Sequence, residues 1–175
     1  MPAVAIRVSI ITVSDGVSAG ARPDQGGPAL EQTLRGSGVE HQIVSREVLP
    51  DEPKQIARAI RVRADAGETD LILVTGGTGV SPRDRTPEGV REVIEFEVPG
   101  LAEKMRWETA RTLPAAYLSR QVVGVRKKTL VVALPGSPKG ATDCLAAILA
   151  LVPHAIALVR GERPEHPTKP GGSAR

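Results

Sequence analysis

Apolar β-type runs alternate with helical stripes along most of this chain. The β-type runs are Arg7–Val13, His41–Leu49, Leu71–Thr75, Gln121–Val125 and Thr129–Leu134. The stretches with apolar residues at helical spacing are Gly26–Ser37, Pro53–Ala66, Pro87–Glu97, Leu101–Arg111 and Pro138–Val152. Such alternation is typical of a mainly parallel sheet covered by helices on both faces. We therefore predict a three-layer α/β/α sandwich, with an antiparallel edge where the last two runs form a hairpin.

The length of 175 residues fits one well-buried domain, with 41% hydrophobic and 25% charged residues. We place that domain at residues 1–161. Residues 162–175 are rich in proline and glycine and almost free of apolar side chains, so we expect a disordered tail. The single cysteine, Cys144, lies in an apolar run and is expected to be a core residue.

Charge and aromatic content bear on possible partners. The formal net charge is only +3, and Lys and Arg are scattered among acidic residues. Only three aromatic residues are present, so neither a basic patch nor a base-stacking surface is expected, and we predict no nucleic acid partner. No apolar run reaches membrane-spanning length and no signal sequence is visible, so we expect a cytoplasmic protein without a membrane partner.

A glycine cluster follows the run Leu71–Thr75 directly. It comprises Gly76, Gly77, Thr78 and Gly79, and the carboxylate of Asp84 comes five residues later. Glycines let backbone N–H groups approach a phosphate closely, and a carboxylate nearby is suited to a metal bound to that phosphate. The alternative is a tight strand-to-helix connection. The spacing matches neither a dinucleotide-binding fingerprint nor a P-loop.

Three further loops follow predicted strands, at Ser14–Gly16, Pro50–Glu52 and Pro135–Pro138. In open parallel sheets such loops converge at the carboxyl ends of the strands, where ligands bind. Asp51 is either a helix N-cap or a second carboxylate that, with Asp84, would hold a divalent cation. Ser137 either caps the last helix or contributes to an anion site at its N-terminus.

Other polar residues carry no assignable chemistry. The histidines His41, His154 and His166 have no metal-ligand spacing and complete no catalytic triad. The basic run Arg126–Lys128 is interpreted as a solvated turn.

Five ordered motifs resemble those of one known family. They are VSD at Val13–Asp15, LPDEP at Leu49–Pro53, TGGTG with PRD and TPE at Thr75–Glu88, LSR at Leu118–Arg120 and LPGSPKG at Leu134–Gly140. The chain resembles, from about Arg7 to Gly161, the molybdopterin adenylyltransferases of molybdenum cofactor biosynthesis, the MogA/MoaB family with the gephyrin G domain.

The resemblance implies a Rossmann-like fold, a homotrimer, and transfer of AMP from Mg²⁺-bound ATP to the terminal phosphate of molybdopterin, giving adenylyl-molybdopterin and pyrophosphate. It also implies a molybdenum-insertase protein as a partner. By motif position, Asp51 and Asp84 match the catalytic and metal-binding aspartates. Six residues match the nucleotide and phosphate loop or its surroundings: Gly76, Gly77, Thr78, Gly79, Ser14 and Asp15. Four match the molybdopterin side of the cleft: Ser119, Gly136, Ser137 and Lys139.

Departures from the family pattern leave alternatives open. Gly16 removes a polar side chain that many members carry, whereas Arg83-Asp84 and Leu118-Ser119-Arg120 favour the catalytically active branch. The first alternative is a MoaB-like, non-catalytic molybdopterin-binding protein or scaffold on the same fold. A weaker alternative is a nucleotide-processing enzyme of the CinA type, against which the LSR and LPGSPKG segments argue.

Overall fold

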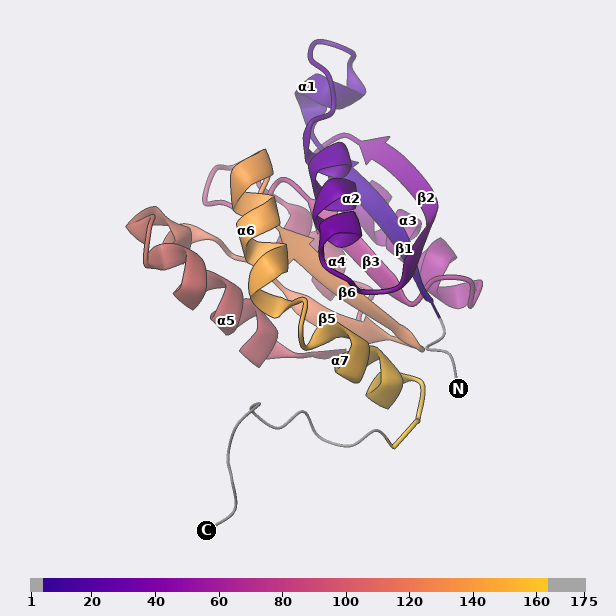
Figure 1. The fold of residues 1–175 in the computed structure, drawn as a ribbon. Coiled ribbons are helices and arrows are strands. Elements are labelled where there is room, and N and C mark those ends of the chain that lie inside the picture. The colour runs from indigo at the N-terminus through magenta and orange to yellow at the C-terminus, as the bar shows by residue number, and fades with distance from the viewer. Residues whose placement is uncertain (1–4, 164–175) are drawn as a thin grey trace.

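The computed structural model describes residues 5–163 and contains a six-stranded sheet (Figure 1). The strand order is β2-β1-β3-β6-β5-β4. The strands are β1 (Ile6–Val13), β2 (His41–Leu49), β3 (Leu71–Thr75), β4 (Phe96–Glu97), β5 (Val123–Arg126) and β6 (Thr129–Leu134). β2, β1, β3 and β6 run parallel, and β5 pairs antiparallel with both β6 and β4. The predicted mainly parallel sheet with an antiparallel edge is confirmed.

Helices cover both faces of the sheet. The helices are α1 (Asp15–Ser18), α2 (Gly26–Gly36), α3 (Pro53–Asp65), α4 (Thr86–Arg91), α5 (Pro99–Ala110), the 3₁₀ helix η1 (Pro114–Leu118), α6 (Pro138–Ile148) and α7 (Val152–Val159). In Figure 1, α2, α5, α6 and α7 lie in front of the sheet, and α3 and α4 lie behind it. The arrangement is the predicted α/β/α sandwich.

The central strands show why both faces must be covered. Along β3, Leu71 and Leu73 face the core formed with α2, α5, α6 and α7, whereas Ile72 and Val74 face the core formed with α3 and α4. All four side chains are at most 1% exposed. Successive side chains of a strand point to opposite faces, so an unbroken apolar run is stable only between two layers.

Two predicted helices end earlier than expected. The expected helix over Pro87–Glu97 with Thr86 as its N-cap is wrong in both bounds, because α4 begins at Thr86 and ends at Arg91. The backbone beyond it instead pairs with the sheet, where Glu95 N–H donates to the carbonyl of Val125 and Val98 N–H to that of Val123. Hydrogen bonding to an available strand outweighs a short helical stripe here.

The last helical stripe also divides in two. The sequence predicted one helix over Pro138–Val152, but α6 ends at Ile148 and α7 begins at Val152, with a bend of 67° between them. Among the described residues, no single helix is long and apolar enough to cross a membrane; only this bent pair taken together passes by length and composition. The predicted tail lies outside the described residues apart from its first two, Glu162 and Arg163.

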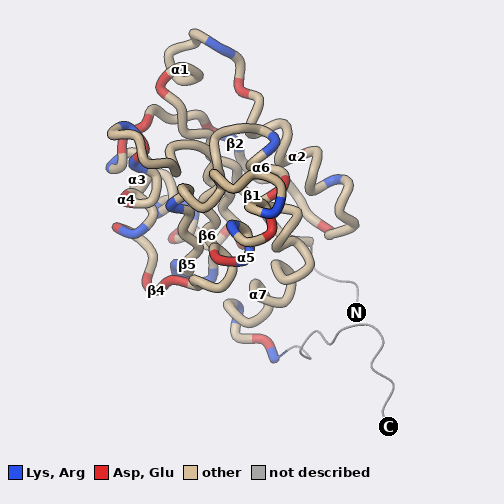
Figure 2. The backbone as a smooth tube through the Cα atoms, turned by 90° about the vertical axis from the view of Figure 1, so that its left-hand side faces the viewer, with Lys and Arg blue, Asp and Glu red and all other residues tan. Residues whose placement is uncertain are grey.

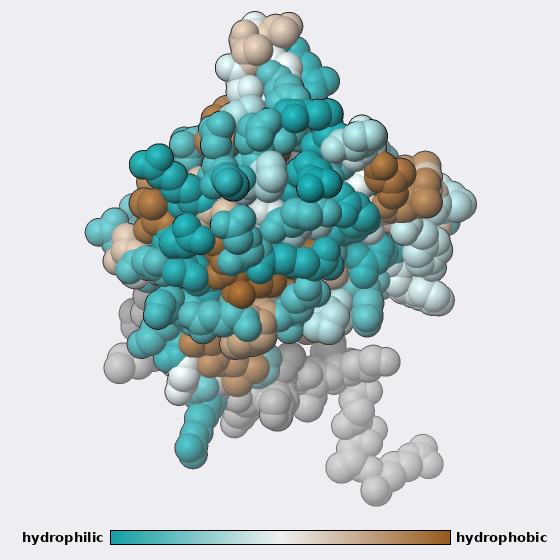
Figure 3. Space-filling model, turned by 180° about the vertical axis from the view of Figure 1, so that it is seen from behind, coloured by the Kyte–Doolittle hydropathy of each residue, from teal (hydrophilic) through white to brown (hydrophobic). Residues whose placement is uncertain are grey.

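The surface mixes charges and carries one conspicuous apolar flank. In Figure 2, Lys and Arg are scattered among Asp and Glu over the molecule. From behind, Figure 3 shows a brown patch at the right, over the end of α5 and η1. We use the name flank patch for the four exposed large side chains of α5, η1 and the turn between them: Trp107 (64%), Leu113 (60%), Tyr117 (59%) and Leu118 (59%).

Candidate functional site

The carboxyl ends of β1, β3 and β6 meet at one edge of the sheet and surround a cavity of about 1040 Å³. A Cβ on Gly76 would lie only 2.0 Å from the carbonyl oxygen of Val13, and the φ of Gly76 is +112°. A Cβ on Gly136 would lie 3.2 Å from the Cα of Gly76. Only glycine at position 76 lets the backbone there come this close to the backbone of Val13.

The glycine loop after β3 has free hydrogen-bond donors. Gly76 donates its N–H to the carbonyl of Leu134 at 3.1 Å, so its part in the site is steric. The N–H groups of Gly77, Thr78 and Gly79 donate to no residue in the described range 5–163. Three free N–H groups in consecutive loop residues that line a cavity are suited to an anionic ligand.

Carboxylates lie against the same loop. A Cβ on Gly77, whose φ is +62°, would lie 2.8 Å from Asp51 Oδ1 and 2.6 Å from Thr86 Oγ1. A Cβ on Gly79 would lie 2.7 Å from Asp84 Oδ2. Thr86 is fully buried, and its hydroxyl has no hydrogen-bond partner among the described residues. Both predicted catalytic aspartates therefore lie beside the loop from which a phosphate would be bound.

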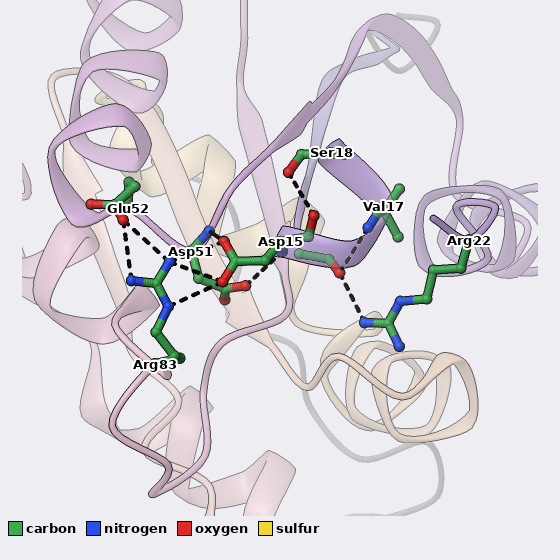
Figure 4. Close-up of polar contacts among 8 residues, drawn as sticks. Asp15, Val17, Ser18, Arg22, Asp51, Glu52 and Arg83 are labelled. Carbon is green, nitrogen blue, oxygen red and sulfur yellow. Dashed lines mark hydrogen bonds and ion pairs between the residues drawn. The ribbon is translucent and has the colours of Figure 1, made fainter. Parts of the chain in front are cut away.

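Asp15 and Asp51 hold each other in place (Figure 4). The N–H of Asp15 donates to Asp51 Oδ2 at 2.8 Å, and the N–H of Asp51 donates to Asp15 Oδ1 at 2.9 Å. Arg83 pairs with Asp15 at 2.9 Å and with Glu52 at 3.2 Å. These contacts connect the loop after β1 to the loop after β2, and Arg83 pairs with one carboxylate from each loop.

The two aspartates have opposite electrostatic surroundings. Burial raises the pKa of Asp51 despite the hydrogen bond from Asp15, and the charges of Asp15 and Asp84 raise it further. The pKa of Asp15 is lowered, mainly by the N–H of Asp51 and also by Arg83. Asp51 therefore carries a negative charge that the protein compensates incompletely, as expected of a group that meets a cation on ligand binding.

Eleven of the twelve predicted site residues line the cavity. The exception is Asp15, which contacts it only through Asp51. Ser119 Oγ lies 3.3 Å from Thr78 Oγ1, and Ser137 caps α6 by accepting from Gly140 N–H at 3.2 Å. Lys139 pairs with Asp143 at 2.7 Å, and its side chain is 86% exposed. Ser137 is therefore the helix cap that the sequence allowed, and it also lines the cavity, as an anion site at this N-terminus requires.

Sequence reasoning missed several residues of this site. Arg22 lines the cavity, and its Nη2 donates to Ser14 Oγ, at the N-terminus of α1, at 2.9 Å (Figure 4). Gln121 and Cys144 line the opposite half, between α5 and α6, with Gln121 Nε2 donating to Cys144 Sγ at 3.2 Å. Cys144 is 1% exposed, as predicted for a core residue, and burial raises the pKa of its thiol.

Weak sequence signals explain these omissions. Arg22 stands in a loop without periodicity, and Gln121 falls within a predicted strand. The adjacent Ser119-Arg120 is the signal closest to Gln121, and Cys144 is visible in the sequence only as an apolar position.

Relatives in sequence agree with this geometry. A family model described as a probable molybdopterin binding domain matches residues 9–154. A molybdopterin adenylyltransferase of Helicobacter pylori is 34% identical over 156 residues, covering 89% of each chain. One of Escherichia coli is 34% identical over 168 residues, covering 89% of this chain and 86% of that one.

Solved structures agree as well. The molybdopterin biosynthesis enzyme MoaB of Thermus thermophilus is 49% identical, with a TM-score of 0.84 over 90% of this chain and 98% of that one. The protein CinA of Thermoplasma acidophilum, at 19% identity and a TM-score of 0.63 over 85% of this chain and 98% of that one, shares the fold alone. By its matched domain, its relatives and its fold, this chain belongs to the molybdopterin-binding family that includes the MogA and MoaB proteins.

Proposed function

We propose that this protein is a molybdopterin adenylyltransferase, which transfers AMP from ATP to the terminal phosphate of molybdopterin and releases pyrophosphate. One observation carries the proposal. A single cavity joins the free N–H groups of Gly77–Gly79 and the carboxylates of Asp51 and Asp84 to a second half between α5 and α6. A volume of about 1040 Å³ is at the upper end of small-molecule sites and suits two substrates.

The glycine-loop half fits the nucleotide. The N–H groups of Gly77, Thr78 and Gly79 would bind phosphate oxygens, and Ser14, held by Arg22, lies on the same wall. Arg22 carries a positive charge that has no ion-pair partner among the described residues, so it is available to a polyphosphate.

Magnesium fits this half through Asp51 and Asp84. Within residues 5–163, no group of three or more acidic, histidine or cysteine side chains could hold a metal ion by itself. Mg²⁺ normally uses only one or two carboxylates and takes its remaining ligands from phosphates and water. The raised pKa of Asp51 and the buried Thr86 hydroxyl, which has no partner among the described residues, support a cation at this place. When bound, the ion would neutralise charge on the pyrophosphate.

The second half of the cavity fits the pterin. The residues that line it include Ser119 and Gly136, together with Ser137 and Lys139 at the N-terminus of α6. The N-terminus of α6, with its Ser137 cap, is electropositive and suits the terminal phosphate of the pterin substrate. The exposed Lys139 ammonium could reach the same phosphate, because its partner Asp143 is also at the surface.

The reaction needs positioning more than proton transfer. The attacking phosphate is already an anion, so no strong general base is needed, and no histidine of the described chain lines the cavity. The protein would hold the two phosphates in line and place loop N–H groups where negative charge develops. Asp15 would keep Asp51 oriented through the paired backbone hydrogen bonds.

We further propose that the protein is a homotrimer of the cytoplasm that passes its product to a molybdenum-insertase protein. Support for assembly comes from the flank patch of Trp107, Leu113, Tyr117 and Leu118. Trp107 and Tyr117 line one shallow surface pocket, and exposed aromatic side chains are enriched at protein interfaces. Light scattering on the purified protein would give the number of subunits.

The decisive experiment mixes the purified protein with molybdopterin, ATP and magnesium. Formation of adenylyl-molybdopterin with one pyrophosphate per product is the expected result. Binding of molybdopterin without pyrophosphate release would instead identify a non-catalytic scaffold.

A further inference from the structure

The loop that bears Asp84 has few hydrogen bonds of its own. Within it, Asp84 N–H donates to the carbonyl of Ser81 at 2.9 Å, and Ser81 N–H donates to Asp84 Oδ2 at 2.8 Å. Thr86 N–H closes the loop onto the carbonyl of Gly77 at 3.0 Å. A loop of this length with two left-handed glycines needs further support to keep one conformation.

That support comes from Arg120. Its backbone N–H donates to the carbonyl of Thr78 at 2.7 Å, and its Nε donates to the carbonyl of Gly79 at 2.8 Å. Its Nη2 donates to the carbonyl of Asp84. Arg120, which follows η1 much later in the chain, thus holds both Thr78-Gly79 and Asp84.

Glu88 on α4 completes the arrangement. It pairs with Arg120 Nη1, and this hydrogen bond is the main reason that the pKa of Glu88 is lowered. The charge of Arg120 is therefore neutralised by a protein carboxylate. Thr78, Gly79 and Asp84 line the cavity, whereas Arg120 does not. Arg120 acts on the site only through the loop.

We propose that Arg120 is a positioning residue, held by Glu88, that sets the places of the Thr78 and Gly79 backbone and of Asp84. The planar guanidinium donates in three directions to three different groups, which a lysine ammonium on a flexible stem cannot reproduce. This inference rests on the proposed adenylyl transfer for its kinetic consequence. Its structural consequence, an ordered glycine loop, is independent of that activity.

Arg126 provides a matched control. It also bridges a carboxylate and a backbone carbonyl, with Nε and Nη2 on Asp65 and Nη1 on Val93 O at 2.9 Å. It lies at the β5–β6 hairpin, at the opposite end of β6 from the cavity. Loss of Arg126 should therefore affect stability without affecting the loop.

The kinetic test compares Arg120→Ala, Arg120→Lys and Arg126→Ala with the wild-type protein. We expect kcat to fall about 10²-fold in Arg120→Ala, because small misplacements of reacting groups have effects of that order. Arg120→Lys should recover only part of the loss, and Arg126→Ala should stay within about twofold, as expected of a site remote from the reacting groups. Added guanidinium ion should restore part of kcat in Arg120→Ala alone. A folded Arg120→Ala with wild-type kcat would overturn the proposal.

Amide hydrogen exchange, followed by NMR without substrates, tests the loop directly. The N–H groups of Ser81, Asp84 and Thr86 should exchange at least about tenfold faster in Arg120→Ala than in Arg126→Ala, since their protection depends on loop opening. Equal exchange in the two variants would refute the positioning role. If the wild-type protein releases no pyrophosphate, the proposed function fails, and the exchange comparison still decides the role of Arg120. Should Arg120→Ala not fold, Arg120→Lys serves in both measurements.

Discussion

The two ends of the sheet surround their carboxylates in opposite ways: Asp70 is buried, and Asp51 is half-buried. At the amino end of β3, Asp70 is 2% exposed and pairs with Arg7 at 2.9 Å and Arg160 at 2.8 Å. These hydrogen bonds outweigh burial and lower the pKa of Asp70 to about 2. At the carboxyl end, Asp51 has no arginine of its own, and burial raises its pKa. The carboxylate at the amino end is satisfied by the protein itself, whereas we propose that a ligand completes the site at the carboxyl end.

We infer from this difference that Asp70 contributes mainly to stability, and that Asp51 and Asp84 contribute mainly to function. Asp70 links β1, β3 and the end of α7, so its charges hold three elements together. Asp51 links only two neighbouring loops, the carboxylate of Asp84 bonds within its own loop, and Gly77–Gly79 leave three donors unused. Unsatisfied groups cost stability, and they persist where a substrate satisfies them.

Replacement of Asp84 should have the largest effect on activity. We expect Asp84→Ala to lower kcat about 10²- to 10³-fold, the range found when one preorganised electrostatic group is removed from an active site. The unfolding midpoint should move little, since Asp84 is partly exposed and its carboxylate bonds only within its loop. Steady-state pyrophosphate release and thermal denaturation measure the two quantities. Near-normal adenylylation by this variant would contradict the assignment of the site.

Replacement of Asp70 should show the converse. Asp70→Asn removes the carboxylate that Arg7 and Arg160 share, and Arg160 keeps only its 3.9 Å pair with Glu162. The change should cost about 2–3 kcal/mol of unfolding free energy, below the cost for a fully buried pair because both arginines are partly exposed. The kcat of the folded variant should be unchanged. Urea denaturation and pyrophosphate release at the same temperature test this. A loss of kcat without a loss of stability would abolish the contrast between the two ends.

Acid should act on the two ends with opposite signs. The folded pKa of Asp70 is about 2, against an ordinary value of 3.8, so its stabilisation is present above pH 3.8 and is lost as pH falls toward 2. That difference corresponds to about 2 kcal/mol. For Asp51, whose pKa is raised, protonation removes a cost of folding instead. Denaturation of wild type and Asp70→Asn between pH 5 and pH 2 should show the steeper loss in the wild type.

Lys139 should give the smallest effect. Its ammonium is exposed, so Lys139→Ala should change stability by less than about 0.5 kcal/mol. We expect a KM for molybdopterin several-fold higher with little change in kcat, because a mobile charge contributes similarly to ground-state and transition-state binding. Lys54, an exposed lysine of α3, provides the control substitution. Equal KM values in the two variants would remove Lys139 from the pterin half.

Much of the fold was predictable because its signals are local. The β3 strand and the α3 helix begin where the sequence predicted, since a fully apolar run and a Pro53 at the first helical turn are unambiguous. The error at α4 had a different origin. Val90 and Val93 do form a helical stripe, but whether residues 95–98 continue it depends on β5, which lies well downstream in the sequence.

The residues of the candidate site also differ in whether a local sequence signal indicates them. Asp51 and Asp84 were predicted as site residues because each follows a strand within a recognisable motif. Arg120 and Gln121 act across long sequence separations, and Arg22 sits in a loop without periodicity. No pattern indicated that Arg120 would bond the backbone of Gly79, because the contact exists only once η1 has returned the chain to the glycine loop.

The flank patch has a practical consequence. Trp107 is the only tryptophan of the chain, and it lies there with 64% of its surface exposed. The intrinsic fluorescence of the protein therefore originates from this flank and not from the interior. If subunits associate through the flank patch, as we propose, the emission maximum would shift on association, and repacking of the core would leave it unchanged.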